Sequence, residues 1–267
     1  MRYVCLLLLL IVFRLEGQDG NYLMGARQGG LGGASVMLQD QWSLFNNISG
    51  IESLEHNAIL SSYNNRFGLK ELQTVAAGYI RHLEDFSMGA SFYRFGGELF
   101  NEQRFQLGVA HRLDRVSLGL SVGYLQYNIS TVDSRGVFVI DFGGIADITD
   151  QISFGAHIFN LNQASLAGRV NVPTIMRAGL SFDVTEDFLV VLETEKDLDF
   201  PEVYKAGLEY RIIDNVWIRT GLRTEPFKGA FGVGFKPRNY LVDYAFSNDV
   251  NLGAIHEVSC SFFIGSQ

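Results

Sequence analysis

The sequence of 267 residues contains little cysteine, little proline and no cluster of positive charge. Its two cysteines are Cys5 and Cys260, and Cys5 lies in a segment that we expect to be removed, so no disulfide within the chain and no cysteine-based metal site are expected. The chain has only 4 prolines, and 47% of its residues are hydrophobic. Disordered chains are rich in proline and poor in hydrophobic residues, so this composition indicates a folded protein. A formal net charge of -8, without clustered Lys or Arg, argues against a nucleic-acid partner.

Long hydrophobic runs are also scarce. The apolar run from Tyr3 to Phe13 follows the basic residue Arg2, and its length of about eleven residues falls short of the roughly 20 that a membrane helix needs. This pattern is typical of a secretory signal peptide, with small Gly17 just before the cleavage point. We therefore expect residues 1–17 to be a signal peptide and the protein to be exported. Later runs are too short for a transmembrane helix, but a β-barrel needs no such run.

Alternation of apolar with small or polar residues is the dominant pattern after residue 56. In "VSLGLSVGYLQYN", Val116, Leu118 and Leu120 alternate with Ser117 and Gly119, and similar runs recur to the end of the chain. A period of two indicates a strand with one apolar face. Helical periodicity is almost absent in this part of the sequence.

Turn signals divide the alternating part into about 14 strands of roughly nine to eleven residues, the length that a tilted membrane strand requires. An even number of strands is expected for a bacterial barrel. The strands are expected to begin near residues 57, 72, 85, 102, 115, 136, 150, 173, 187, 202, 215, 227, 239 and 254. The predicted fold class is therefore all-β: a transmembrane antiparallel β-barrel of about 14 strands, with residues 56–267 forming the barrel in contact with outer-membrane lipid.

The alternative is a soluble secreted β-sandwich, which also alternates apolar and polar faces. Two features favour the membrane barrel over it. Aromatic-rich apolar faces occur in nearly every run, with almost no helix or proline between them, and the opposite faces carry Gly, Ser and charged residues that suit a hydrated interior.

Charged residues on the polar faces are expected to point into the lumen, because each would cost up to a few kcal/mol when facing lipid at mid-depth. Their signs are mixed, which favours cross-strand ion pairs that hold the barrel in register over a conduit selective for one charge. These predicted lumen-facing charges are Arg177, Asp183, Glu193, Glu195, Lys205, Glu209, Arg211, Arg219, Arg223, Asp243 and Glu257.

The glycine-rich stretch "GARQGGLGGAS" at residues 25–35 fits no nucleotide-binding template. No Gly-Lys-Ser/Thr follows it, and the only apolar run ahead of it belongs to the signal peptide, so neither a P-loop nor a dinucleotide fingerprint is present. The five histidines are single, without the i, i+4 pairing of a zinc helix. We expect no cofactor, no metal and no enzymatic activity.

A plug is the remaining interpretation of the residues between the signal peptide and the first strand. A 14-stranded barrel lies between small filled barrels and wide open porins, so its lumen must be open or occupied. Glycine suits a backbone that packs closely against other groups. We expect residues 18–55 to be an N-terminal plug in the lumen, with a short helix from Asp40.

The stretch "GARQGGLGGASVMLQDQWSLFNNISGI" resembles the N-terminal signature of the PorV/PorQ family, within the FadL-like outer-membrane barrels. The family's Gly-Ala-Arg, Gly-Gly-Ala, acidic residue and Asn-Pro-Ala-Gly occur in this order, although Ile48 and Ser49 replace the Pro and Ala. "DYAF" at residues 243–246 is similar to its closing strands. The glycine stretch and the resemblance together give the predicted plug residues: Gly25, Ala26, Arg27, Gly29, Gly30, Gly32, Gly33, Ala34, Asp40, Asn47 and Gly50.

The resemblance implies a non-enzymatic 14-stranded outer-membrane barrel with a plug, and two functions remain open. PorV-like proteins act with the type IX secretion machinery, which predicts a subunit or adaptor of a secretion or surface-assembly complex with protein partners. FadL-like proteins admit hydrophobic molecules, which predicts a passive transporter of small hydrophobic compounds.

Overall fold

Fourteen strands form one closed antiparallel ring in the computed structural model of the chain, which describes residues 23–130, 132–166, 170–249 and 252–265. Each strand pairs with its neighbours in sequence, and β1 closes the ring against β16 from Asn57 opposite Ile264 to Arg66 opposite Ile255. The predicted fold class, a closed antiparallel barrel of 14 strands, is confirmed. The predicted signal peptide, residues 1–17, lies outside the described residues.

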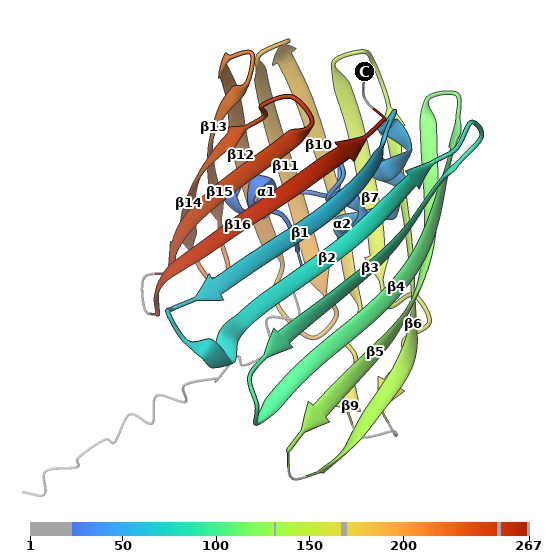
Figure 1. Cartoon of the computed structure of the whole chain (residues 1–267), viewed down its shortest axis with the longest axis vertical. Coiled ribbons are helices and arrows are strands. Elements are labelled where there is room, and N and C mark those ends of the chain that lie inside the picture. Colours follow the sequence, from blue (N-terminus) through green and yellow to red (C-terminus); the bar gives the residue numbers. More distant parts are fainter. Residues whose placement is uncertain (1–22, 131, 167–169, 250–251, 266–267) are drawn as a thin grey trace, which may run out of the picture.

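The strands follow the alternating runs of the sequence (Figure 1). The first half of the barrel comprises β1 (Asn57–Arg66), β2 (Gln73–His82), β3 (Ser87–Gly96), β4 (Phe100–Leu113), β5 (Val116–Ile129), β6 (Val132–Asp147) and β7 (Ile152–Phe159). The second half comprises β10 (Ile175–Thr185), β11 (Phe188–Asp197), β12 (Val203–Ile213), β13 (Val216–Arg223), β14 (Lys228–Phe235), β15 (Tyr240–Asp249) and β16 (Gly253–Ile264).

The short elements lie before and between these strands. They are α1 (Ala26–Gly30), α2 (Ser43–Asn46), the 3-10 helices η1 (Ile48–Ser53) and η2 (Lys70–Leu72), and a two-stranded hairpin of β8 (Ser165–Leu166) and β9 (Val170–Asn171). Among the residues that the structure describes, no helix is long and apolar enough to cross a bilayer.

All fourteen barrel strands begin within four residues of the expected positions, and the largest difference is at β6, which begins at Val132. The expected strand lengths are partly wrong. Strands β4 and β5 have 14 residues each and β6 has 16, because they continue past their neighbours at one end of the barrel (Figure 1). Strands β7, β13 and β14 have only 8 residues.

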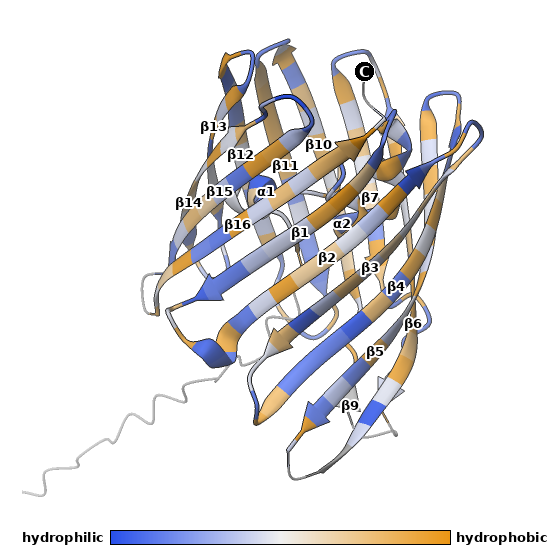
Figure 2. Ribbon diagram, viewed as in Figure 1, coloured by the Kyte–Doolittle hydropathy of each residue, from blue (hydrophilic) through white to orange (hydrophobic). Residues whose placement is uncertain are grey.

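The apolar faces of the strands point outward and the small or polar faces point inward. In β5, Leu118, Leu120 and Val122 are exposed, whereas Ser117 and Ser121 are buried. Figure 2 shows the resulting alternation of hydrophobic and hydrophilic residues along the strands. Soluble proteins rarely expose such a continuous apolar surface, whereas a membrane barrel requires it. The soluble sandwich is therefore excluded.

The two ends of the barrel differ in their connections. At the turn end, where β1 begins and β16 ends, six links join the strands, among them residues 114–115, 186–187 and 214–215. At the mouth, where β1 ends and β16 begins, the connection between β7 and β10 spans residues 160–174 and contains the β8–β9 hairpin. We use these two names, turn end and mouth, below.

Candidate functional site

Residues 23–56, which we call the inner segment, lie inside the ring of strands (Figure 1). Helix α1 contacts β13 to β16, and η1 contacts β3 to β6, so the segment crosses the lumen from one wall to the other. Trp42, Leu44 and Ile51 are completely buried there. Besides the short helix near the expected position, α2, the segment contains α1 and η1, which the sequence pattern did not predict.

A ring of inward-facing glycines in the barrel wall receives the inner segment. Each lies between the third and the seventh residue from the turn end of its strand. A Cβ atom added to any of them would come within 3.0 Å of an atom of the segment, closer than real side chains approach. These glycines are Gly78, Gly89, Gly108, Gly119, Gly143, Gly155, Gly179, Gly207, Gly221 and Gly232.

The closest approach joins backbone to backbone. A Cβ at Gly221 would lie 2.2 Å from the backbone N of Gly32, and a Cβ at Gly30 would lie 2.9 Å from the Cα of Gly232. Gly32 also has a positive φ of 70°, a conformation that glycine adopts at no steric cost. The glycines of the segment and of the wall therefore serve one steric requirement.

Arg27 connects the inner segment to the wall through charge. Its Nε and Nη2 donate to the carboxylate of Glu209 at 2.9 and 2.7 Å, and its Nη1 donates to Asp40 at 2.9 Å. Burial by itself lowers the pKa of Arg27, but Glu209 and Asp40 outweigh burial and hold the pKa above its ordinary value. The guanidinium stays charged, and this two-pronged geometry is specific to arginine.

The network of Arg27 continues into the wall. Arg219 donates to Glu209 and, at 2.6 Å, to Asp243, so each carboxylate has a cation beside it. Asp40 also holds the inner segment together through hydrogen bonds within the segment. Gln28 donates to Asp40 Oδ2 at 2.9 Å, and the Trp42 backbone N–H donates to Asp40 Oδ1 at 2.7 Å.

A second polar contact holds the middle of the inner segment. The backbone N–H groups of Ser35 and Val36 both donate to one oxygen of Glu193, at 2.7 and 2.8 Å. Lys205 donates to Glu193 and to Glu195 at 2.8 Å each. Asn47 completes the attachment at the far wall, where its amide donates to the backbone of Val36 at 2.6 Å and approaches the carbonyl oxygens of Gly144 and Ala156 at 3.4 Å.

The remaining predicted plug residues are also near these contacts. Gly29 lies against Glu257, Gly50 lies against Ser43 and Leu38, and the backbone N–H of Ala26 donates to Ser259 at 3.0 Å. Gly25 and Gly33 have positive φ angles, and Ala34 is fully buried.

Eight of the eleven predicted lumen-facing charges are buried: Arg177, Glu193, Glu195, Lys205, Glu209, Arg219, Asp243 and Glu257. Arg177 pairs with Glu195 at 2.7 Å and thereby extends the cluster of Lys205. The other three lie at the ends of the barrel. Arg211 pairs with Asp187 at the turn end at 2.6 Å, Asp183 is near the same end, and Arg223 is near the mouth.

The sequence analysis did not single out the polar cluster on β4 and β6. Arg104 donates to Asp141 at 2.5 Å, both are buried, and His157 is buried nearby on β7. The signal was present, since Arg104 alternates with the apolar residues of its strand. No group of three or more His, Cys, Asp or Glu within the described residues is arranged to hold a metal ion.

A cavity of about 680 Å³ occupies the lumen between the inner segment and the mouth. Leu23, Gly29, Gly32 and Gly33 of the inner segment border it. Its walls combine aromatic and apolar side chains with charged ones. The aromatic residues are Phe67, Phe95, Phe100, Tyr127 and Phe200.

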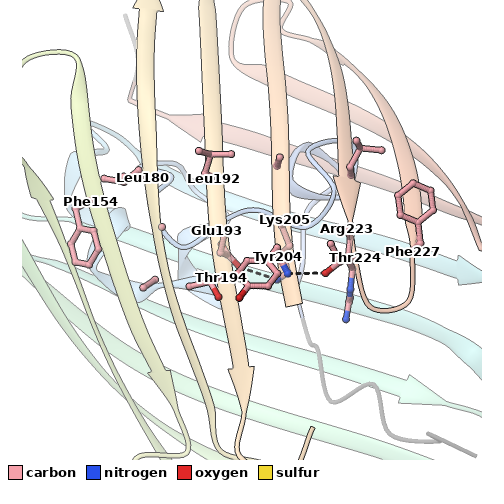
Figure 3. A pocket seen from close by; sticks show the side chains of 14 residues that line it. Phe154, Leu180, Leu192, Glu193, Thr194, Tyr204, Lys205, Arg223, Thr224 and Phe227 are labelled. Atoms are coloured by element: carbon pink, nitrogen blue, oxygen red, sulfur yellow. Dashed lines mark hydrogen bonds and ion pairs between the residues drawn. The ribbon is translucent and has the colours of Figure 1, made fainter. Parts of the chain in front are cut away.

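A second concavity, of about 610 Å³, lies on the lipid-facing surface of β7 and β10 to β13 (Figure 3). Leu180, Leu192 and Tyr204 project on this side, whereas the Glu193–Lys205 pair projects into the lumen. The barrel wall separates this outer groove from the cavity at the mouth.

No protein-family model and no curated protein matches the sequence. Solved structures share its fold. The toluene transporter TodX of Pseudomonas putida is 11% identical with a TM-score of 0.68, and the match covers 90% of this chain and 97% of TodX. The toluene transporter TbuX of Ralstonia pickettii is 12% identical with a TM-score of 0.67, covering 94% and 98%. A FadL homologue of Pseudomonas aeruginosa is 10% identical with a TM-score of 0.66, covering 90% and 98%.

At these identities the likeness establishes the fold, that of FadL-type outer-membrane channels. Together with the apolar exterior, it confirms the predicted location in the outer membrane. The finer resemblance to the PorV/PorQ family stays a prediction.

Proposed function

We propose that this protein is a non-enzymatic passive channel that carries small hydrophobic compounds across the outer membrane. One observation carries the proposal: the cavity at the mouth has aromatic walls beside nine charged residues and ends on the inner segment. Binding sites for small molecules are typically concave and lined by apolar and aromatic side chains, with polar groups that orient the ligand. The toluene transporters TodX and TbuX, which have this fold, support the same class of function here.

In this proposal residues 18–55 act as the plug. Its described part occupies the half of the lumen nearer the turn end, where wall glycines and buried ion pairs hold it. The longest described connection between barrel strands is at the mouth, and extracellular loops are usually longer than periplasmic turns. The mouth therefore faces outward, and a compound that enters the cavity meets the plug before it reaches the periplasm.

Uptake of radiolabelled toluene tests the proposal, in cells of a host without its own hydrocarbon channels. Cells that carry the protein should take up toluene faster than cells with an empty vector. Ser247→Trp adds an indole to the cavity lining and should reduce this gain severalfold. Ala178→Trp adds the same group to the lipid-facing groove and should leave uptake unchanged.

The outcome that would contradict the channel is equally direct. If the folded barrel is present in the outer membrane, as heat-modifiable gel migration shows, and uptake of every hydrophobic compound tested equals that of the empty vector, the proposal is wrong.

The role as a subunit or adaptor of a type IX secretion-like complex rests on the PorV/PorQ resemblance alone. The residues that carry it, from Gly25 to Gly50, are mostly buried against the barrel, so they serve packing and offer no surface to a partner. The channel is therefore the better supported function. Affinity purification from native membranes tests the adaptor role, since a barrel recovered without secretion or surface proteins would count against it.

A further inference from the structure

The cavity at the mouth has more acidic than basic residues in its lining. Six carboxylic residues border it, namely Glu102, Glu195, Asp197, Glu225, Asp249 and Glu257, against the three basic residues Arg66, Arg223 and Lys228. Asp249 pairs with Lys228 at 3.4 Å, and Glu195 pairs with Lys205 and Arg177. Outside these pairs the lining has four carboxylic residues and two basic ones, and one of the two, Arg66, has its guanidinium 5.7 Å from the centre of the Phe95 ring. A cleft lined mainly by one sign of charge attracts ligands of the other sign and repels its own.

Two buried hydrogen-bond acceptors border the same cavity without partners. Asn64 on β1 and Glu257 on β16 face each other in the sheet register, and they are only 8% and 7% exposed. The Asn64 amide donates to Glu257 Oε2 at 3.5 Å, whereas Asn64 Oδ1 and Glu257 Oε1 accept no hydrogen bond from any described residue. An unsatisfied buried acceptor costs free energy, and a ligand that donates a hydrogen bond removes that cost.

The aromatic part of the cavity lies on strands β3 to β5. The rings of Phe100 and Tyr127 are 6.1 Å apart between centres, and Phe95 extends this surface toward Arg66. Aromatic surfaces of this kind receive flat apolar groups, because rings stack or meet edge to face at such separations. One cavity therefore offers an aromatic surface for the apolar body of a ligand and, in a separate place, acceptors for a hydrogen-bond donor on the same ligand.

We infer that the cavity takes neutral or cationic small molecules that combine an apolar, preferably aromatic, body with a hydrogen-bond donor, and that it disfavours carboxylates. Asn64 and Glu257 accept the hydrogen bond of the donor group, while Phe95, Phe100 and Tyr127 contact the body. This selectivity rests on the proposed channel function and specifies its class of substrate. A hydrogen bond to a buried acceptor that otherwise has no donor favours such a ligand over a plain hydrocarbon.

Three probes of nearly the same shape separate these contributions: toluene, 4-methylphenol and 4-methylbenzoate at pH 7. Their binding to the whole purified protein in detergent is measured by calorimetry. We expect 4-methylphenol to bind about tenfold more tightly than toluene, the size of one net hydrogen bond. We expect 4-methylbenzoate to bind at least about tenfold more weakly than 4-methylphenol.

The variant Glu257→Gln keeps the shape of the side chain and replaces one acceptor oxygen with an NH2 donor. It should weaken the binding of 4-methylphenol by roughly threefold to tenfold, leave the binding of toluene unchanged, and reduce the discrimination against 4-methylbenzoate, because the amide NH2 can donate to its carboxylate. Glu186→Gln is the matched control, because it makes the same change at the turn end, outside the cavity, and should change none of the three affinities. Asn64→Ala deletes the second acceptor and provides an independent test if the Glu257 variant does not fold.

The inference is overturned if 4-methylbenzoate binds as tightly as 4-methylphenol, or if toluene and 4-methylphenol bind equally in the wild type. It is also overturned if the Glu257 and Asn64 variants, once folded, retain the preference for the phenol. Each of these results leaves the proposed channel function unaffected, provided that toluene still binds. If none of the three probes binds, the proposed function fails together with the selectivity.

Discussion

The two halves of the lumen are lined by different kinds of residue. Toward the turn end, wall glycines and the inner segment approach each other closely, and buried ions such as Glu209 and Glu193 have partners on the segment. Toward the mouth, the strands carry Phe95, Phe100 and Tyr127 around an unfilled cavity. The first half has the properties of a packed core and the second those of a binding site. Substitutions should therefore affect stability in one half and ligand binding in the other.

The largest effect is expected where backbones touch. Gly221→Ala places a Cβ 2.2 Å from the backbone of Gly32, so strand or segment must move, and overpacking of this severity should cost about 3 kcal/mol or more. Gly229→Ala, in the neighbouring strand, meets only a side-chain atom at 3.9 Å and should change stability by less than about 1 kcal/mol. Denaturant titration of both barrels measures the difference. Equal stability would show that the close contact is not a constraint.

Removal of Glu209 is expected to lower the free energy of unfolding slightly less than Gly221→Ala does. Glu209→Ala leaves Arg27 and Arg219 buried without this carboxylate, and such a loss typically costs about 3–5 kcal/mol, part of which Asp40 and Asp243 offset here. The control is Asp187→Asn, which breaks the exposed pair with Arg211 and should leave the unfolding midpoint unchanged. If the two variants unfold alike, the buried network contributes nothing.

Arg27→Lys tests the geometry of the same contact and keeps its charge. Lysine cannot donate in parallel to both oxygens of Glu209 while it also reaches Asp40, so we expect a loss of about 2 kcal/mol. The unfolding free energy should lie between those of the wild type and Glu209→Ala. A lysine variant as stable as the wild type would mean that charge alone holds the segment.

The smallest effect on stability is expected at the mouth. Phe100 is 39% exposed, so Phe100→Ala should cost only about 1–2 kcal/mol. Because Phe100 borders the cavity beside Tyr127, the same change should weaken toluene binding roughly threefold to tenfold. Calorimetry and denaturant titration on one preparation give both numbers. Unaltered toluene affinity would place the ligand elsewhere in the lumen.

Much of the barrel was predictable because a period of two reports directly on which face of a strand meets lipid. Leu118 and Leu120 alternate with Ser117 and Gly119, and this pattern placed strand β5 correctly. Strand lengths were less predictable, since the run of β6 continues past the point where its pairing with β7 ends at Phe142 opposite Ile158. Where a strand stops depends on its partners, and a single run carries no information about them.

The candidate site was predictable in type but not in arrangement. The polar face of β12 indicated that Lys205 and Glu209 point inward, yet nothing in the spacing indicated that Glu209 meets Arg27, 182 residues away. The glycines of the wall were visible as small residues on the inward face. That they face glycines and backbone of the inner segment became apparent only in the folded barrel.

By itself, the sequence determined the class of fold, the approximate positions of the strands and the inward or outward direction of most side chains, because hydrophobic periodicity is a local property of the chain. The tertiary structure decided which half of the lumen is filled, which carboxylate pairs with which cation, and where Asn64 Oδ1 and Glu257 Oε1 remain without a hydrogen-bond donor among the described residues. These depend on closing the ring: β1 meets β16 only when all fourteen strands are in place, and distant residues such as Asn64 and Glu257 then become neighbours.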